Sequence, residues 1–359
     1  MSKLSSLSMK GFVLRLLSYL LLPFSVLYYI VIKIKNGLYD VGFLPERKLQ
    51  GTVISVGNLT LGGTGKTPLV EYIAKLIQNQ GLKVALLSRG YARKKRIPLV
   101  VVSNGKNMLV GVEIAGDEPL QLARNLSGVV VVVDKNRYQA GLKAQEKYDV
   151  DLFILDDGYQ HRKLARDVNI LLVDGKNLFN TGLLFPAGKL REPVSSIKRA
   201  DAVVLSEPLS KSNENIIKKK IMRYKADLPL FHCYRYPVGF YTAKGDNPLQ
   251  EGFFSSRNIF SLAAIAQPAA FEEGLRNMGF NLAKTYRFSD HHYYTQEEIE
   301  TIARSAKKVD IEAIITTQKD AVRLGHLKEV NPPLIYLKIE MRVREKEKFH
   351  TFLVQSITS

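Results

Sequence analysis

A glycine-rich loop that ends in a lysine and a threonine is the clearest chemical signal in the chain. Residues 55–68 read SVGNLTLGGTGKTP. Backbone N–H groups can surround phosphate oxygens without side-chain obstruction where glycines stand, here at Gly62, Gly63 and Gly65. Lys66 can then reach the β- and γ-phosphates of a nucleotide, and the Thr67 hydroxyl can ligate Mg²⁺. The spacing therefore predicts a phosphate loop (P-loop).

The loop departs from the G-x-x-x-x-G-K-[ST] pattern at one position, where Thr60 replaces the first glycine. A glycine turn followed by a chance Lys-Thr pair is the alternative. The flanking sequence favours the phosphate loop. Thr52–Val56 is β-branched and strand-like, and Pro68 suits the first turn of a helix.

Two adjacent carboxylates follow another apolar run. Residues 151–157 read DLFILDD, so a predicted strand ends in Asp156 and Asp157. Carboxylates at the carboxyl end of a parallel strand lie close to the phosphate loop of a neighbouring strand, where they can hold Mg²⁺ directly or through water. A strand that ends in an acidic turn is the alternative, and the nearby phosphate loop favours the metal interpretation.

Three shorter clusters carry further polar groups: GDEP at 116–119, FPAGKLREP at 185–193 and SDHH at 289–292. Each also fits a turn, a solvated loop or a helix N-cap, and spacing alone favours those interpretations. A functional alternative is that Asp117 and His291 pair as carboxylate and imidazole and act as a general base. His292 is the neighbouring candidate for the same role.

The segments that must position these residues alternate between apolar strands and helices. Short apolar runs without polar alternation are typical of buried parallel strands. We expect strands at Thr52–Val56, Lys83–Ser88, Val129–Asp134, Leu152–Asp156, Asn169–Val173 and Ala202–Leu205. A helix is expected at Leu69–Gln80, with Gly81 ending it. The pattern predicts an α/β fold with a mostly parallel, P-loop NTPase-like sheet.

The sequence changes in texture after these strands. Lys211–Lys220 is polar and basic and predicts a surface helix, and the aromatic-rich His232–Tyr241 predicts extended connecting strands. A second, smaller α/β alternation then begins at Ile259. Its expected strands are Ile259–Ile265, Ala313–Thr317 and Leu334–Ile339, and its expected helices are Ala269–Met278 and Gln296–Lys307.

An uncharged run of 17 residues, Leu16–Ile32, lies near the N-terminus. No small-residue cleavage site follows it, which argues against a signal peptide. Its helical length of roughly 25 Å falls short of a hydrocarbon core of ~30 Å, and Pro23 interrupts it. Basic residues flank it on both sides, at Lys10, Arg15, Lys33 and Lys35. These features favour a monotopic helix in one anionic leaflet, with a spanning helix and a core helix as alternatives.

The predicted organisation is therefore a membrane-anchor helix at 1–40, a P-loop core domain at 41–225, connecting strands at 226–250 and a C-terminal α/β domain at 251–359. A length of 359 residues is sufficient for two domains. Lys and Arg number 52 against 34 Asp and Glu, which gives a net charge of +18. This excess favours a nucleic acid, an anionic membrane or a phosphorylated substrate as partner. Cys233 is the only cysteine, so no intrachain disulfide forms.

Taken together, the motifs resemble the tetraacyldisaccharide 4'-kinase (LpxK) family over nearly the whole chain, and Thr60 fits that family's version of the loop. Seven segments in the same order carry the resemblance: GNLTLGGTGKTP at 57–68, SRGY at 88–91, GDEP at 116–119, DDGYQH at 156–161, FPAGKLREP at 185–193, DHH at 290–292 and TTQKDAVRL at 316–324.

The resemblance implies an enzyme that transfers the ATP γ-phosphate to the 4'-hydroxyl of a tetraacylated glucosamine disaccharide 1-phosphate. The product is lipid IVA, an intermediate of lipid A and lipopolysaccharide biosynthesis. It further implies a location at the cytoplasmic face of the inner membrane.

The resemblance also assigns residues. It implies ATP binding by Gly62, Gly63, Thr64, Gly65, Lys66 and Thr67. It implies Mg²⁺ binding by Thr67, Asp156 and Asp157, and catalysis by Lys66, Asp117 and His291. Arg191 matches a basic position on the substrate side, and a phosphorylated acceptor accounts for a basic run that includes Arg89.

Two other classes of function compete with this interpretation. Membrane-associated partitioning ATPases have a similar loop, but it carries an extra lysine where this chain has Leu61. The net charge is also compatible with a nucleic-acid-binding module. The apolar anchor and the lack of a basic repeat interleaved with aromatic residues argue against that class, so no nucleic-acid partner is expected.

Overall fold

The computed structural model of the chain describes residues 2–176, 178–179, 181–207, 211–250, 252–254 and 257–358, without the side chains of 2–18, 211 and 212. Lys10 and Arg15, two of the basic flanks of the apolar run, thus lie outside the described side chains. Two compact units alternate along the chain. Unit 1 comprises Met1–Lys66, Leu152–Tyr234 and Val343–Ser359, and unit 2 comprises Thr67–Asp151 and Arg235–Arg342. The predicted division of the chain into 41–225 and 251–359 stays a prediction.

Unit 1 is built on a parallel sheet whose strands are almost entirely buried. Its order is β8-β7-β6-β1-β5. The strands are β1 (Thr52–Gly57), β5 (Leu152–Asp156), β6 (Val168–Asp174), β7 (Ala202–Ser206) and the first residues of β8 (Leu230–Thr242). In the register of β1 and β5, Val56 lies opposite Asp156. The phosphate loop and the paired carboxylates therefore follow neighbouring strands at the same edge of the sheet, as predicted.

Short helical segments cover this sheet. They are the 3₁₀ helix η1 (Val194–Arg199), α6 (Lys211–Met222) and α10 (Lys346–Thr358). Ile197, Ile217 and Ile221 pack with strand residues such as Leu171 and Val203 in one buried cluster. The basic surface helix that the sequence predicted is α6.

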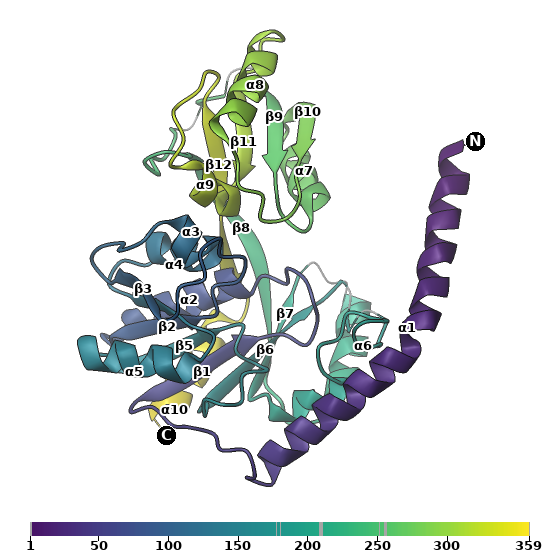
Figure 1. Cartoon of the computed structure of the whole chain (residues 1–359), viewed down its shortest axis with the longest axis vertical. Helices are drawn as coiled ribbons and strands as arrows, with labels where there is room; N and C mark the ends of the chain where they lie inside the picture. The colour runs from purple at the N-terminus through teal and green to yellow at the C-terminus, as the bar shows by residue number, and fades with distance from the viewer. Residues whose placement is uncertain are drawn as a thin grey trace. The chain divides into compact units, whose positions relative to one another are not determined.

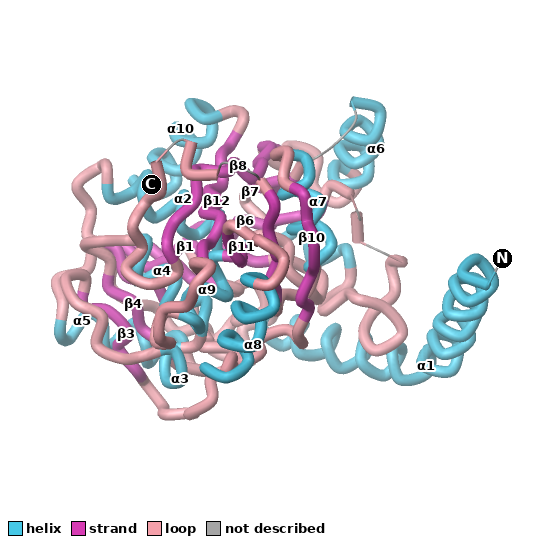
Figure 2. The backbone as a smooth tube through the Cα atoms, turned by 90° about the horizontal axis from the view of Figure 1, so that it is seen from above, coloured by secondary structure: helices cyan, strands magenta, loops and turns pink. Residues whose placement is uncertain are grey.

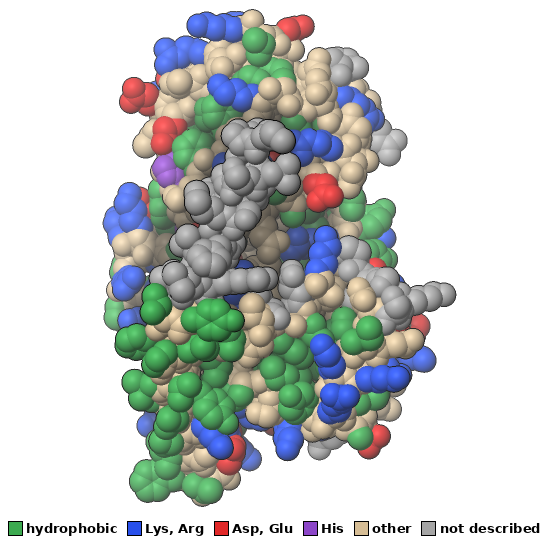
Figure 3. Space-filling model, turned by 90° about the vertical axis from the view of Figure 1, so that its right-hand side faces the viewer, with side chains coloured by type: hydrophobic (Ala, Val, Ile, Leu, Met, Phe, Trp, Pro, Cys, Tyr) green, Lys and Arg blue, Asp and Glu red, His purple; other side chains and the backbone are tan. Residues whose placement is uncertain are grey.

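The N-terminal segment forms one long helix, α1 (Ser2–Asp40), with Pro23 inside it (purple in Figure 1). Its described part is largely exposed: Tyr19, Leu20, Phe24 and Leu27 each expose 60 % or more of their surface. Hydrophobic side chains gather on the lower part of the face shown in Figure 3, along which α1 runs. The span Tyr19–Asp40 is long and apolar enough to cross a membrane. This exposure excludes the alternative of a buried core helix.

One part of unit 2 continues from the phosphate loop. It contains α2 (Lys66–Gln78), β2 (Val84–Ser88), β3 (Val100–Asn104), α3 (Val112–Ala115), α4 (Asp117–Asn125), β4 (Val130–Val133) and α5 (Arg137–Lys147). β2 and β4 are parallel, and β3 runs antiparallel to β4. The sequence analysis did not predict β3, whose run of three valines is short and is followed by the polar residues Ser103 and Asn104.

The other part of unit 2 is the second α/β alternation. Its strands are β9 (Asn258–Ala263), β10 (Asn281–Arg287), β11 (Ala313–Thr317) and β12 (Leu334–Val343), and its helices are α7 (Pro268–Asn277), α8 (Gln296–Lys307) and α9 (Gln318–Leu324). The strand order is β10-β9-β11-β12, with all neighbours parallel.

Successive residues of β9 pack against helices on opposite faces of the sheet. Ile259 packs with α7 and Phe260 packs with α8, so helices cover both faces of the sheet (Figure 2). A capping box between Thr295 and Glu298 starts α8. The mostly parallel α/β fold predicted from the sequence is confirmed by the strand pairings.

Candidate functional site

The phosphate loop spans residues 58–65 and leads from β1 into α2. Gly62 and Gly65 have φ angles of +115° and +92°, which side chains rarely tolerate. A Cβ atom at Gly62 or Gly63 would meet no protein atom within 4 Å. Packing within the protein therefore does not require glycine at position 63. A phosphate group that packs against the backbone at this position would need the space that a side chain takes, so glycine at position 63 fits a nucleotide-binding loop.

A buried asparagine organises this loop from inside. Asn58 is fully buried and follows β1 directly. Its Nδ2 donates to the hydroxyls of Thr60 and Thr64 at 3.3 and 3.0 Å, and its Oδ1 accepts from Lys66 Nζ at 3.3 Å. Asn58 thereby fixes the direction of the Lys66 side chain. The sequence analysis missed it, although a polar residue directly after a buried strand was a usable signal.

A second segment pairs with the loop by main-chain hydrogen bonds. The Leu61 N–H donates to the Lys189 carbonyl, and the Arg191 N–H donates to the Leu59 carbonyl, both at 2.7 Å. The FPAGKLREP motif, whose spacing alone favoured a solvated loop, thus forms the partner of the phosphate loop.

Asp157 lies between two cations of unit 1. Arg191 Nη1 donates to both of its carboxylate oxygens at 2.9 and 2.8 Å, and Lys66 Nζ lies 3.6 Å from Oδ1. Asp157 has a φ of +53°, a left-handed conformation that is strained for a residue other than glycine. Such strain concentrates at functional sites.

Asp156, the last residue of β5, is buried. Among the described residues no group of three or more His, Cys, Asp or Glu side chains forms a complete metal site. Mg²⁺ needs no such site, because it normally binds to one or two carboxylates together with substrate phosphates and water. Asp156 and Asp157 are two adjacent carboxylates of the kind that such a site uses. Thr67 and Arg89 belong to unit 2, where Thr67 is half-buried and Arg89 is exposed after β2.

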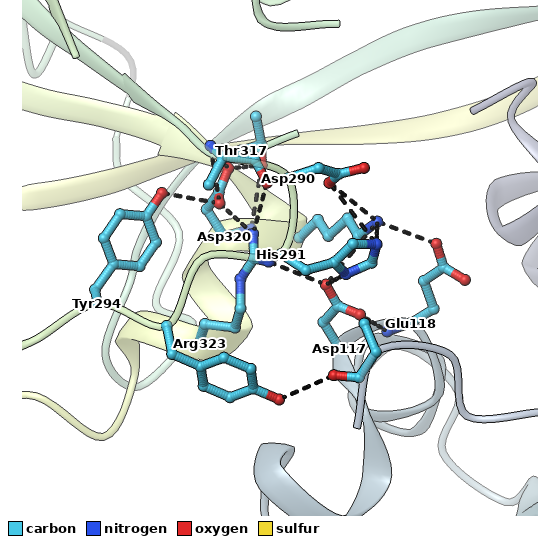
Figure 4. A network of polar contacts seen from close by, with 12 residues as sticks. Asp117, Glu118, Asp290, His291, Tyr294, Thr317, Asp320 and Arg323 are labelled. Atoms are coloured by element: carbon cyan, nitrogen blue, oxygen red, sulfur yellow. Dashed lines mark hydrogen bonds and ion pairs between the residues drawn. The ribbon is translucent and has the colours of Figure 1, made fainter. Parts of the chain in front are cut away.

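In unit 2 the structure brings together Asp117 and His291, which are 174 positions apart (Figure 4). Asp117 is the first residue of α4 and is 3 % exposed. His291 Nδ1 lies 2.8 Å from Asp117 Oδ2. His291 also has a left-handed φ of +62°. His292 lies instead 3.1 Å from both Glu298 oxygens. The geometry therefore selects His291 as the partner of Asp117.

Two cations of α9 complete this cluster, and the sequence analysis missed both. Arg323 Nη1 lies 3.3 Å from Asp117 Oδ2. Lys319 Nζ lies 3.1 Å from Glu118 and 3.4 Å from His291 Nε2. An ammonium group can only donate hydrogen bonds, so the contact with Lys319 requires His291 Nε2 to be the acceptor. Nδ1 then carries the ring proton and donates a hydrogen bond to Asp117. Both cations lie in the TTQKDAVRL motif, which the sequence analysis used only as part of the family resemblance.

A buried network behind the cluster holds Arg323 in place. Asp320 is fully buried and bonds to Arg323, and it accepts from the hydroxyls of Thr317 at 2.6 Å and Tyr294 at 3.0 Å. Arg323 Nη2 also donates to the Ala264 carbonyl at 3.0 Å. Every charge in this buried site thus has a charged or hydrogen-bonded partner, which burial of charge requires.

The charges of the cluster reinforce each other. Burial, the largest influence, would raise the pKa of Asp117, but its hydrogen bond with His291 and the charges of Lys319 and Arg323 outweigh burial and lower it. Burial would likewise lower the pKa of Lys319, but Glu118, Asp117 and Asp290 raise it. At neutral pH the site therefore holds the Asp117 carboxylate beside the Lys319 ammonium group.

Comparison with known proteins gives consistent matches. The family model described as Tetraacyldisaccharide-1-P 4'-kinase matches residues 17–358. The tetraacyldisaccharide 4'-kinase of Desulfotalea psychrophila is 39% identical over 304 residues, which cover 84% of this chain and 86% of the relative. That of Geobacter sulfurreducens is 38% identical over 342 residues, with coverage of 95% and 94%.

A solved structure matches as well. The crystal structure of LpxK from Aquifex aeolicus, described as an apo form in complex with ATP, superposes with a TM-score of 0.77 at 34% identity. The match covers 95% of this chain and 99% of that one.

Proposed function

The chain belongs to the tetraacyldisaccharide-1-P 4'-kinase family, and from that premise we propose how its residues perform the reaction. The enzyme is an ATP-dependent kinase of lipid A biosynthesis that acts on a lipid disaccharide. It transfers the γ-phosphate of ATP to the 4'-hydroxyl of a tetraacylated glucosamine disaccharide 1-phosphate and forms lipid IVA. The single observation that carries the proposal is the phosphate loop, in which Asn58 and Asp157 hold Lys66.

The loop residues Gly62, Gly63, Thr64, Gly65, Lys66 and Thr67 bind the phosphates of ATP. The open space beside Gly62 and Gly63 supports this assignment. Lys66 neutralises charge on the transferring phosphoryl group. Thr67, Asp156 and Asp157 would hold Mg²⁺, and the ion would stabilise the negative charge of the β- and γ-phosphates.

His291 serves as the base for the acceptor hydroxyl. Its Nε2 accepts the hydroxyl proton, while Asp117 keeps the proton on Nδ1 and stabilises the imidazolium that forms. The 2.8 Å contact between the two side chains supports this role. The Lys319 ammonium group donates to Nε2 at 3.4 Å and gives up that contact when the hydroxyl binds. It keeps Glu118 at 3.1 Å, with Asp117 and Asp290 also nearby.

Arg191 and Arg89 act on the substrate side. Arg191 does so together with Asp157, which it holds by two hydrogen bonds, so it couples the acceptor side to the metal ligands. The exposed Arg89 is available to an anionic group such as the 1-phosphate of the acceptor. We also propose that the P-loop core domain ends near residue 225 and that the C-terminal α/β domain begins near residue 251.

The enzyme works as a monotopic protein at the cytoplasmic face of the inner membrane. The inner face of α1 carries the polar side chains of Ser25, Tyr28 and Asn36, which bond to unit 1, while Val26, Leu27 and Ile30 face outward. An apolar face that the protein leaves uncovered fits the acyl layer of a bilayer. Lys33 and Lys35 fit its anionic headgroups.

The acceptor dependence of ATP turnover tests the proposal. We expect ADP formation by the purified, full-length protein to require Mg²⁺ and to rise with added acylated disaccharide 1-phosphate. Duplex DNA and vesicles without the disaccharide serve as controls and should not stimulate it. Turnover that DNA stimulates, or that ignores the disaccharide, would contradict the proposed function.

A further inference from the structure

One stripe of α1 carries polar residues in an otherwise apolar helix. Ser25, Tyr28 and Asn36 are spaced by 3 and 8 residues, so all three lie on one face of the helix. Ser25 is only 5 % exposed. An apolar side chain would fill the same position without needing a partner. Three polar residues in one stripe therefore indicate a contact with specific geometry.

The partner of this stripe is the segment 184–192, which we name the coupling segment. Ser25 Oγ donates to the Leu184 carbonyl and accepts from the Ala187 N–H, both at 2.9 Å. Tyr28 Oη donates to the Arg191 carbonyl at 2.9 Å. These contacts reach main-chain atoms, so they fix the path of the backbone rather than one side-chain rotamer.

The coupling segment also bonds to the phosphate loop. The peptide N–H of Arg191 donates to the Leu59 carbonyl at 2.7 Å, while the carbonyl of the same residue accepts from Tyr28. The side chain of Arg191 holds Asp157, which lies 3.6 Å from Lys66 Nζ. A continuous set of hydrogen bonds, completed by the ion pair of Asp157 and Lys66, therefore runs inside unit 1 from the N-terminal helix to the phosphate-binding lysine.

We propose that Tyr28, with Ser25 beside it, is a positioning residue for phosphoryl transfer, acting through the Arg191 main chain on Asp157 and the phosphate loop. The N-terminal helix then has two separable faces. The outer apolar face attaches the protein to the membrane, and the inner polar stripe holds the coupling segment in the conformation that transfer requires. This inference rests on the proposed kinase function.

The environment of Tyr28 suits a permanent donor. Burial, together with the charge of Glu192, raises the pKa of its phenol, so the hydroxyl stays protonated across the working pH range. The ring also contacts the Phe185 ring edge-on, with centroids 6.1 Å apart. Replacement by phenylalanine removes the hydroxyl and retains this ring contact.

The chain offers a matched control in the next residue. Tyr29 is half-buried, its ring lies 5.7 Å from Lys33 Nζ, and among the described contacts its hydroxyl makes no hydrogen bond to the coupling segment. Full-length Tyr28→Phe, Ser25→Ala and Tyr29→Phe would be compared with wild type in mixed micelles containing the acylated disaccharide 1-phosphate. The measurements are kcat, KM for both substrates, and sedimentation with anionic vesicles.

We expect Tyr28→Phe to lower kcat roughly 5- to 10-fold, since the loss of one partly buried hydrogen bond misplaces groups that act in transfer. KM for the lipid and vesicle binding should stay within about twofold of wild type, because the outer face is unchanged. Hydrogen exchange at the amides of Leu61 and Arg191 should accelerate in the same variant. Tyr29→Phe should match wild type throughout.

A kcat for Tyr28→Phe equal to that of Tyr29→Phe would overturn the inference, as would a loss of activity that follows only weaker vesicle binding and a higher lipid KM. If Tyr28→Phe fails to fold, Ser25→Ala decides by the same criteria, with exchange read at the Ala187 amide. Wild-type protein that phosphorylates no lipid disaccharide would refute the proposed function itself, whereas active wild type with indistinguishable variants refutes only the coupling.

Discussion

At the scale of single residues, the buried Asp117 carboxylate and its charged neighbours form a closely connected set of contacts in unit 2. This one nearly inaccessible carboxylate meets His291, Arg323 and, at 3.9 Å, Lys319. Loss of such a carboxylate removes one partner from each of these buried or half-buried cations. The side chains that surround it therefore form one functional group rather than independent contacts.

The pair of Asp117 and His291 should behave as one catalytic unit. We expect His291→Ala and Asp117→Ala each to lower kcat by about 10²–10⁴, with little change in ATP affinity. The double variant should be little worse than the worse single variant, because removal of either partner already disables the base. Steady-state kinetics of the four proteins measure this. Fully multiplicative losses would indicate independent roles, and wild-type kcat in His291→Ala would exclude it as the base.

The lowered pKa of Asp117 also predicts a pH dependence of stability. A carboxyl group whose folded-state pKa lies below its ordinary value of 3.8 stabilises the fold fully above that value. The contribution disappears as pH falls through the lowered folded-state pKa. We expect Asp117→Asn to lower the free energy of unfolding by about 2–3 kcal/mol at pH 7. This loss of stability relative to wild type should become smaller below about pH 4.

Thermal unfolding from pH 7 to pH 3 measures this deficit. Asp149→Asn is the control, because Asp149 forms an exposed ion pair with Lys83 and should change stability very little. A deficit for Asp117→Asn that stays constant down to pH 3 would show that the carboxylate charge does not contribute to the fold.

Asp156 and Asp157 should affect activity through the metal ion. We expect Asp→Asn at a metal ligand to raise the Mg²⁺ concentration needed for half-maximal activity at least tenfold. At Asp157 the same change also weakens the bond to Arg191, so kcat should fall at saturating Mg²⁺ as well. Mg²⁺ titrations of both variants test the assignment. Curves that overlay wild type would exclude both residues as ligands.

At the scale of elements, α1 separates membrane attachment from site organisation. We expect Leu27→Ser and Ile34→Ser, which change side chains about 60 % exposed, to weaken vesicle binding and raise KM for the lipid. KM for ATP should remain unchanged, because the inner stripe is intact. Co-sedimentation with anionic vesicles, together with kinetics, checks both parts. Full binding by the double variant would mean that attachment lies elsewhere on the protein.

Some elements could be predicted from the sequence and others could not, for physical reasons. The phosphate loop and the strand before Asp156 are encoded in local spacing, so both were predicted. The roles of Lys319 and Arg323 depend on Asp117 and Glu118, which lie far along the chain, and no local pattern marks them. The polar stripe of α1 was hidden for the same reason, since the partners of Ser25 and Tyr28 lie 159 and 163 positions away. Asn58 bonds to residues of its own loop, and only its place directly after a buried strand could have indicated it.

At the scale of the whole molecule, the net charge of +18 and the apolar helix describe a protein that works on anionic lipid. In the sequence, the net charge alone left nucleic acid, an anionic membrane and a phosphorylated substrate open as partners. The apolar run with its basic flanks favoured the membrane, and the resemblance of the motifs supplied the lipid acceptor. The structure shows that several of the cations in this positive excess pair with carboxylates of their own unit. Lys66, Arg191, Lys319 and Arg323 all neutralise carboxylates there.

The central claim is that Lys66 in the phosphate loop supports transfer of the ATP γ-phosphate to a lipid disaccharide. Mass spectrometry of the lipid after incubation with full-length protein, ATP and Mg²⁺ tests it most directly. We predict that the wild-type product gains one phosphate at the 4' position. Lys66→Ala should form at least about 10²-fold less product with an unchanged Tm, while the exposed control Lys83→Ala matches wild type. An unmodified lipid in the presence of ATP hydrolysis, or transfer by folded Lys66→Ala within a few-fold of wild type, would contradict the account.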